Sequence, residues 1–169
     1  HINATPDRKQ KIDFYKQIGE IYASELNDVE RAIETLNAIL NIDSEDEESL
    51  DKMAELQSRK EDWSKAHETL QRLAKTVSDP ARKVDLYCRL GKLNEEHLMN
   101  RGAAIEHFRS ALDIDAGHLP SLEMLRNIHL NEGNWGEAAR TLESEQAYTE
   151  NARAKSKLQY DLGALFSQK

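Results

Sequence analysis

Cysteines and aromatic residues are scarce in this sequence of 169 residues. The single cysteine, Cys88, excludes an internal disulfide framework and favours a reducing compartment such as the cytoplasm, although periplasmic proteins also have few cysteines. Aromatic residues make up 6% of the chain, which leaves few large side chains to anchor a core. Many small packing contacts must therefore hold the fold together.

Long apolar runs and an excess of positive charge are absent as well. No run approaches the roughly 20 apolar residues of a bilayer-spanning helix, so we expect no membrane span. No secretion signal opens the chain, which begins abruptly and stops inside a helical pattern; we expect a fragment of a longer protein of unknown location. With 23 basic against 31 acidic residues, the charge of −8 argues against nucleic acid and favours a basic or amphipathic protein partner.

The motifs of common catalytic and metal sites are missing too. The sequence has no Gly-rich phosphate loop, no HExxH and no Cys-x-x-Cys, and no two histidines lie three or four residues apart. Arg89 could lower the pKa of the neighbouring Cys88 thiol if the side chains met, but no base is evident. We therefore expect no catalytic residue, no metal site, no cofactor and no enzymatic activity.

A repeat of 72 residues runs through the chain. Gly19, Gly91 and Gly163 occupy the same place in three similar helical patterns. Six further residues recur at the same offset, in the pairs Ala32 and Ala104, Asp43 and Asp115, Leu50 and Leu122, Trp63 and Trp135, Ala66 and Ala138, and Leu70 and Leu142. A fixed period indicates neighbouring units that bury a core which none could bury alone.

Each period divides into two halves, because Ala54 stands in the glycine slot between Gly19 and Gly91. The best unit carries Tyr87, Leu90, Gly91, Ala104 and Phe108, and here the sequence resembles the tetratricopeptide repeat, in which W-x2-L-G-x2-Y precedes A-x3-F. The resemblance covers nearly the whole chain. It implies an all-α fold, a right-handed superhelical array of antiparallel helix pairs with about nine helices. We expect one array with units at about 6–43, 44–78, 79–115 and 116–149, and the first helix of a fifth at 151–168.

Polar residues before apolar periodic segments predict where helices begin. Pro6, Pro80 and Pro120 suit first helical turns, with Thr5 and Ser78 or Asp79 as caps. Asp62 is expected to cap the helix that follows it. Three capping boxes are expected, formed by Asn27 with Glu30, Ser44 with Glu47, and Asn134 with Glu137.

The glycine slots predict close helix contacts. A glycine within a helix costs roughly 1 kcal/mol relative to alanine, so its recurrence needs a reason. We expect Gly19 and Gly91 to face Ala32 and Ala104, where two backbones approach. In the fourth unit Arg126 occupies this slot and must reach outward or widen the pair. Glu145 there replaces an apolar residue.

The resemblance implies a concave surface, lined mainly by first helices, that receives an extended or helical peptide. Matching the lining positions residue by residue gives the candidates Lys16, Gln17, Glu20, Lys52, Glu55, Arg59, Arg89, Lys92, Met124, Asn127 and Asn131. One subset of the family clamps a partner's C-terminal carboxylate with Lys and Asn. Lys16 matches one such position, but Glu20 replaces an Asn and would repel a carboxylate, so we expect no clamp.

Two features have a structural and a functional interpretation. The acidic residues between Asp43 and Asp51 could attract a basic partner, but acids at a helix start also favour its positive dipole end, and we prefer this interpretation. Trp63 and Trp135 could anchor a ligand, although their helical spacing favours packing.

The predicted function is a protein-interaction scaffold that binds a partner peptide or helix on its concave surface. The alternative is a regulatory or assembly arm of a larger enzyme or complex, which would contact partners through helix faces or array ends. Self-association through those ends stays open.

Overall fold

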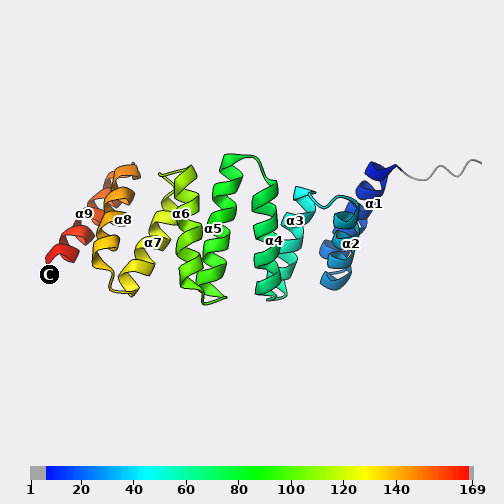
Figure 1. The fold of residues 1–169 in the computed structure, drawn as a ribbon, viewed down its shortest axis with the longest axis horizontal. Coiled ribbons are helices and arrows are strands. Elements are labelled where there is room, and N and C mark those ends of the chain that lie inside the picture. Colours follow the sequence, from blue (N-terminus) through cyan, green and yellow to red (C-terminus); the bar gives the residue numbers. More distant parts are fainter. Residues whose placement is uncertain (1–6, 168–169) are drawn as a thin grey trace, which may run out of the picture. The chain divides into compact units, whose positions relative to one another are not determined.

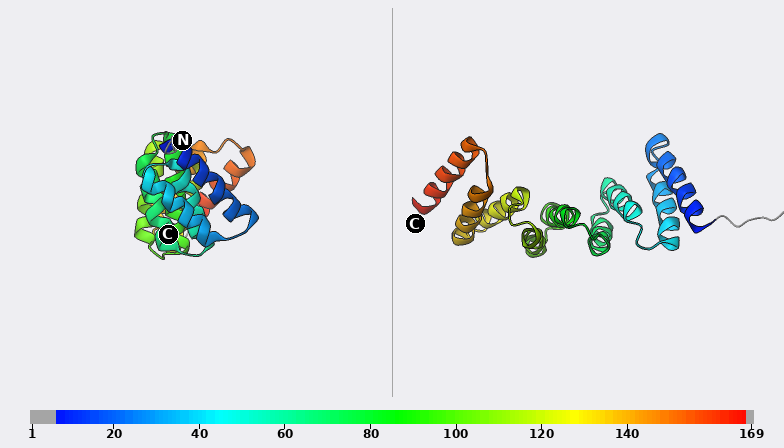
Figure 2. Two further views of the ribbon diagram at one scale, coloured as in Figure 1. Left: turned by 90° about the vertical axis from the view of Figure 1, so that its right-hand side faces the viewer. Right: turned by 90° about the horizontal axis from the view of Figure 1, so that it is seen from above.

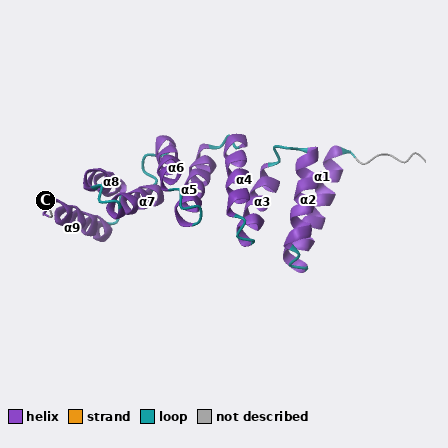
Figure 3. Cartoon of the chain, turned by 60° about the horizontal axis from the view of Figure 1, so that its bottom comes forward, coloured by secondary structure: helices purple, strands orange, loops and turns teal. Residues whose placement is uncertain are grey.

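The computed structural model describes residues 7–167, with side chains to Ala164, and this part of the chain contains helices and no strand (Figures 1 and 3). Pro6 and the expected cap Thr5 lie outside the described residues. The helices are α1 (Arg8–Glu20), the π-helical turn η1 (Ile21–Glu25), α2 (Val29–Ile42), α3 (Glu47–Arg59), α4 (Trp63–Thr76), α5 (Pro80–Glu96), α6 (Arg101–Ile114), α7 (Leu119–Asn131), α8 (Trp135–Tyr148) and α9 (Ala152–Ser167).

The helices fall into two compact units, each larger than one repeat. From here on, the first unit is the part that ends at Val77 and the second unit is the part that begins at Ser78. In the first unit, α1 with η1 packs against α2 and α3 packs against α4, in antiparallel pairs that lie side by side in Figures 1 and 2. Helix α2 also packs against α3. In the second unit α5 pairs with α6 and α7 with α8, and α9 packs against α8. The expected antiparallel pairs are present, whereas a single continuous array stays a prediction.

Aspartate and asparagine side chains start several helices. Asp79 accepts a hydrogen bond from the Arg82 amide, as expected, and Pro80 occupies the first turn of α5. Asn100 likewise caps α6 through the amide of Ala103.

All three predicted capping boxes are wrong. Asp28, not Asn27, caps α2 through the amide of Arg31, and Asp46, not Ser44, caps α3 through the amide of Ser49. Asn134 precedes α8 but donates to Glu132. Asp62 occupies the N-cap position of α4, but its side chain makes no capping hydrogen bond and instead pairs with the Lys65 side chain at 2.7 Å. Adjacent polar residues offer similar cap chemistry, and the path of the loop decides which one is used.

The turn between the two helices of each pair has a common backbone conformation. Each turn has one residue with positive φ, namely Asn27 (49°), Glu61 (59°), Met99 (53°) and Gly133 (70°). The amide that follows bonds a carbonyl five or six residues back, at 2.8 to 2.9 Å. This arrangement satisfies carbonyl groups at the helix end and is typical of left-handed helix caps.

The glycine slots differ from the expected arrangement. Ala32 and Ala104 are buried as predicted, but a Cβ on Gly91 would lie 2.5 Å from the ring of Phe108. The glycine therefore accommodates Phe108 rather than the alanine. A Cβ on Gly19 would meet Thr35 at an ordinary 3.5 Å, so packing does not require glycine there.

The fourth pair compensates for the change in its glycine slot. Arg126 does not reach outward; its guanidinium pairs with Glu145 of α8 at 2.5 Å, and the two side chains are 16% and 12% exposed. The two residues that depart from the repeat pattern therefore bind each other.

The aromatic residues expected in the core are less buried than predicted. Trp135 is 44% exposed and Trp63 is half-buried. Tyr87 is half-buried and stacks on His107 with ring centroids 6.3 Å apart.

Candidate functional site

A cavity of about 250 Å³ opens in the first unit between α1 with η1, α2 and α3. Five of the six candidate residues of this unit line it, and the sixth, Gln17, is exposed outside the lining. The lining residues are Lys16, Gly19, Glu20, Ala23, Ser24, Leu36, Glu48, Ser49, Lys52, Glu55, Leu56 and Arg59. The structure therefore brings five predicted side chains to one place.

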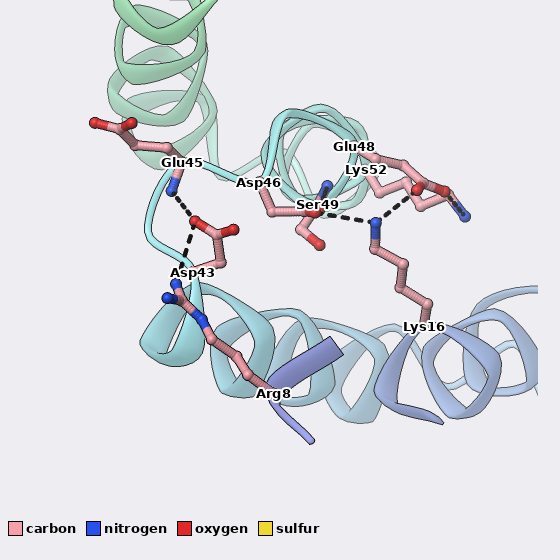
Figure 4. A network of polar contacts seen from close by, with 8 residues as sticks. All are labelled: Arg8, Lys16, Asp43, Glu45, Asp46, Glu48, Ser49 and Lys52. Carbon is pink, nitrogen blue, oxygen red and sulfur yellow. Dashed lines mark hydrogen bonds and ion pairs between the residues drawn. The ribbon is translucent and has the colours of Figure 1, made fainter. Parts of the chain in front are cut away.

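Two lysines of the cavity are bound by carboxylates. Lys16 of α1 reaches across to α3, and its amine lies 3.0 Å from Asp46 and 2.8 Å from Glu48 (Figure 4). Lys52 lies 2.9 Å from Glu20 and 3.4 Å from Glu48. These ion pairs connect α1 to α3 and neutralise much of the local charge.

The ion pairs also shift pKa values. The hydrogen bond from Lys16 lowers the pKa of Glu48 below its ordinary value. The hydrogen bond to Glu20 raises the pKa of Lys52. For Asp46, burial alone would raise the pKa, but hydrogen bonds from Ser49 and Lys16 outweigh it, and the pKa is lowered. Asp46 and Glu48 are therefore negatively charged, and Lys52 positively charged, at neutral pH.

Lys16 is therefore poorly placed to hold a peptide carboxylate. Its ammonium already has two carboxylate partners, and a third anion would compete with both. Glu20 adds a further negative charge to the lining. These contacts agree with the expectation that this chain has no carboxylate clamp.

Glu55 and Arg59 differ from the lysines. Both are exposed on α3, and among residues 7–167 neither forms an ion pair. The Arg59 guanidinium donates a hydrogen bond of 2.9 Å to the neutral amide oxygen of Asn27. The cavity wall thus has one negative and one positive group without an opposite charge bound to it.

The remaining lining is small or apolar. Leu36 and Leu56 are each 5% exposed, and Gly19 and Ala23 contribute little side-chain volume. Sequence reasoning missed Ala23 and Ser24, which lie one helical turn beyond Gly19 and Glu20. That spacing of four residues is the signal that could have identified them.

The acidic segment at the start of α3 is occupied by internal contacts. Asp43 accepts a hydrogen bond from the amide of Glu45 and lies 3.8 Å from Arg8 (Figure 4). Asp46 caps α3 and also binds Lys16. These contacts support the structural interpretation of this segment.

The candidates of the second unit are more dispersed. Arg89 is half-buried 4.0 Å from Asp85, and Met124 packs against the core formed around Phe108. Lys92 and Asn131 are exposed on different helices. Asn127 lines a cavity of about 380 Å³ with Arg126, Leu130, Trp135, Leu142, Asp161 and Ala164.

The residues considered for chemistry lie in unreactive environments. Cys88 is 5% exposed, and burial raises the pKa of its thiol rather than lowering it. Over the part of the chain that the structure describes, no cluster of three metal-binding side chains occurs. In the same part, every helix is too short or too polar to cross a membrane.

Comparisons with known proteins agree with the fold of paired helices. Residues 121–154, which span α7, α8 and the start of α9, match the family model of the tetratricopeptide repeat. No curated protein sequence matches the chain.

Several solved structures share the fold. MamA aligns with a TM-score of 0.69 at 17% identity, over 94% of this chain and 90% of its own. YrrB, described as a TPR protein with an unusual peptide-binding site, aligns with a TM-score of 0.64 at 18% identity, over 96% of this chain and 77% of its own. PilF of Pseudomonas aeruginosa aligns with a TM-score of 0.59 at 15% identity, over 95% of this chain and 86% of its own.

Residues 121–154 therefore match a tetratricopeptide repeat, and the chain shares the fold of tetratricopeptide-repeat structures such as YrrB. The expected all-α class, built from antiparallel helix pairs, is confirmed. Proteins of this family generally mediate protein–protein interactions.

Proposed function

We propose that the first unit binds a peptide segment of a protein partner in the cavity between α1, α2 and α3. The observation that carries the proposal is the convergence of five candidate side chains, from α1 and α3, on one cavity whose lining combines charged and apolar side chains. Ligand sites typically combine apolar surface with a few placed polar groups, and this cavity does so. The partner is a protein segment with both apolar and charged side chains.

Binding rather than catalysis fits the chemistry of the cavity. Lys16 and Lys52 are held as ammonium groups by carboxylates, so neither supplies a neutral amine as a base or nucleophile. The solved structure of YrrB, whose fold this chain shares, is described as having a peptide-binding site.

A substitution at the cavity lining tests the proposal. Gly19→Leu adds a side chain at a buried lining residue, where a Cβ would contact Thr35 of α2 at 3.5 Å, whereas Gly136→Leu adds the same side chain on α8, where a Cβ meets nothing within 4 Å. We expect a phage-displayed library of random peptides to yield sequences that bind the wild type and the Gly136→Leu variant but not the Gly19→Leu variant. Circular dichroism checks that all three proteins are folded.

Two results would count against peptide binding in this cavity. Selected peptides that bind the Gly19→Leu variant as well as the wild type would place their site elsewhere. A library that yields no binder to the wild type would remove the proposed function itself.

Assembly through helix faces is a second candidate, favoured by the outer face of α1. Phe14 and Ile21 are 61% and 50% exposed, whereas Ser49 and Leu56, at the same positions of α3, are buried. Positions that are covered on α3 are therefore uncovered on α1. We expect Phe14→Asp to abolish any concentration-dependent association in analytical ultracentrifugation. Association that survives this substitution would exclude α1 as the contact.

A further inference from the structure

We infer that the partner segment inserts one apolar side chain into the cavity of the first unit, between an acidic residue that meets Arg59 and a basic residue that meets Glu55. The inference rests on the proposed function and specifies the chemistry of the ligand. It follows from which charged side chains of the lining are in ion pairs within the protein and which are not.

Most charges of the lining are used within the protein. The amine of Lys16 is bound by Asp46 and Glu48, and that of Lys52 by Glu20 and Glu48. A ligand group that approached any of these charges would have to break an ion pair. These residues set the shape of the cavity and contribute little to the choice of ligand charge.

Glu55 and Arg59 are the lining residues that can determine which charges of a ligand bind. They lie four residues apart on α3, hence about 6 Å along its axis on one face. Neither is in an ion pair among the described residues, and Arg59 is held by the neutral Asn27 side chain. Even a direct ion pair between Glu55 and Arg59 at this spacing would contribute only about 0.3 to 0.5 kcal/mol. Charged groups of a partner can therefore replace such a contact.

The size and lining of the cavity indicate a single apolar side chain. Its volume of about 250 Å³ lies below the roughly 300 to 1,000 Å³ of sites for drug-sized ligands. Leu36, Leu56 and Ala23 supply apolar surface. Gly19 lines the cavity without a side chain, and helix packing does not require glycine there, because a Cβ would make an ordinary contact with Thr35 at 3.5 Å.

The corresponding positions of α5 carry the opposite order of charge. Lys92 and Glu96 stand 37 residues after Glu55 and Arg59. The preference that we infer for the first unit is therefore not a general feature of the repeats. Arg109 of α6 provides a matched control for charge reversal, because it is exposed, belongs to the second unit and is not among the candidate binding residues.

Charge-reversal variants of the full chain test the inference with a phage-displayed library of random linear peptides. We expect the wild type to select peptides with one apolar, one acidic and one basic residue. Arg59→Glu leaves two negative groups and should select two basic residues; Glu55→Lys leaves two positive groups and should select two acidic residues. Arg109→Glu should select the same peptides as the wild type.

Affinities of a selected peptide supply a second readout. Fluorescence anisotropy should show a loss of about tenfold for the wild-type peptide with Arg59→Glu or Glu55→Lys, since a tenfold loss corresponds to about 1.4 kcal/mol. The loss should shrink at high salt, which screens exposed charges.

The outcomes separate the inference from the proposed function. The selected peptides could fail to bind Gly19→Leu and yet carry the same charges whether the wild type, Arg59→Glu or Glu55→Lys selected them. That result would support the proposed function and overturn the inference. Selection that changes equally with Arg109→Glu would also overturn it. Failure to select any peptide that Gly19→Leu rejects would overturn the proposed function, and the inference with it.

Discussion

At the scale of single residues, the recurring glycines have different physical roles. Gly91 leaves room for the ring of Phe108, whose side chain is fully buried. Gly19 has no comparable neighbour and lies in the cavity lining instead. Packing therefore requires glycine at one of these two positions and not at the other.

This difference predicts opposite effects of alanine at the two positions. Gly91→Ala would place Cβ 2.5 Å from Phe108, and we expect overpacking to lower the free energy of unfolding by about 1 to 2 kcal/mol after the gain in helix propensity. Gly19→Ala should raise it by up to about 1 kcal/mol, because its Cβ has an ordinary contact. Urea unfolding measures both. Equal effects would show that the slots are equivalent.

The pair Arg126 and Glu145 gives a second prediction at this scale. Glu145→Ala should cost about 3 kcal/mol, because it leaves the largely buried Arg126 without its closest carboxylate. The double variant Arg126→Ala with Glu145→Leu imitates Ala54 and Leu73 of the second pair. We expect it to be at least as stable as the wild type. A double variant as unstable as Glu145→Ala, in a urea double-mutant cycle, would contradict this account.

At the scale of secondary-structure elements, the turns within the pairs share one conformation although their residues differ. Gly133 occupies the left-handed position before α8, whereas Glu61 occupies it before α4. Left-handed backbone costs a residue with a side chain roughly 1 kcal/mol or more, and glycine avoids that cost.

Substitutions at these turns should therefore have opposite signs. We expect Glu61→Gly to stabilise the protein by about 1 kcal/mol and Gly133→Ala to destabilise it by a similar amount. Thermal and urea unfolding check both variants. Destabilisation by Glu61→Gly would mean that contacts of its side chain outweigh the backbone cost.

The contact between α1 and α3 predicts acid sensitivity of the first unit. Lys16 holds the pKa of Glu48 below its ordinary value, so the carboxylate binds protons more readily in the unfolded chain. Its contribution is present above the unfolded pKa of about 4.3 and is lost as pH falls through the lower folded pKa. Lys16→Met should flatten the fall in stability below about pH 4, measured by urea unfolding across pH. An unchanged pH profile would exclude this contact as the cause.

At the scale of the whole molecule, contacts concentrate within two units of helix pairs. Helices of such repeats pack mainly against their neighbours in sequence, so coupling is local and unfolding need not be two-state. Stability is therefore a property of each segment rather than of the chain as a whole.

A core deletion should reveal this local coupling. Phe108→Ala removes a fully buried ring from the second unit and should cost about 3 to 5 kcal/mol. We expect hydrogen exchange to accelerate most in α5 to α8 and least in α1 and α2. Uniform acceleration in every helix would indicate one cooperative unit.

Much of the fold could be predicted because its signals are local. The three- and four-residue spacing of apolar side chains predicted the helices, and Pro80 predicted the start of α5. Candidates such as Lys16 and Glu55 followed from matching the repeat, without knowledge of their contacts. The spacing of four residues could also have placed Ala23 and Ser24 next to Gly19 and Glu20, but the π-helical conformation of η1 has no comparable signal in the residue pattern.

The sequence by itself determined the helices, their pairing and the slots that recur, because periodicity and turn chemistry act over a few residues. Tertiary structure decided that Asp28 and Asp46 cap their helices, that Gly91 faces Phe108, and that Arg126 meets Glu145. These outcomes depend on the angles and distances at which helices cross, and small changes in packing alter them. The cavity of the first unit is decided in the same way, by three helical segments whose side chains meet only after folding.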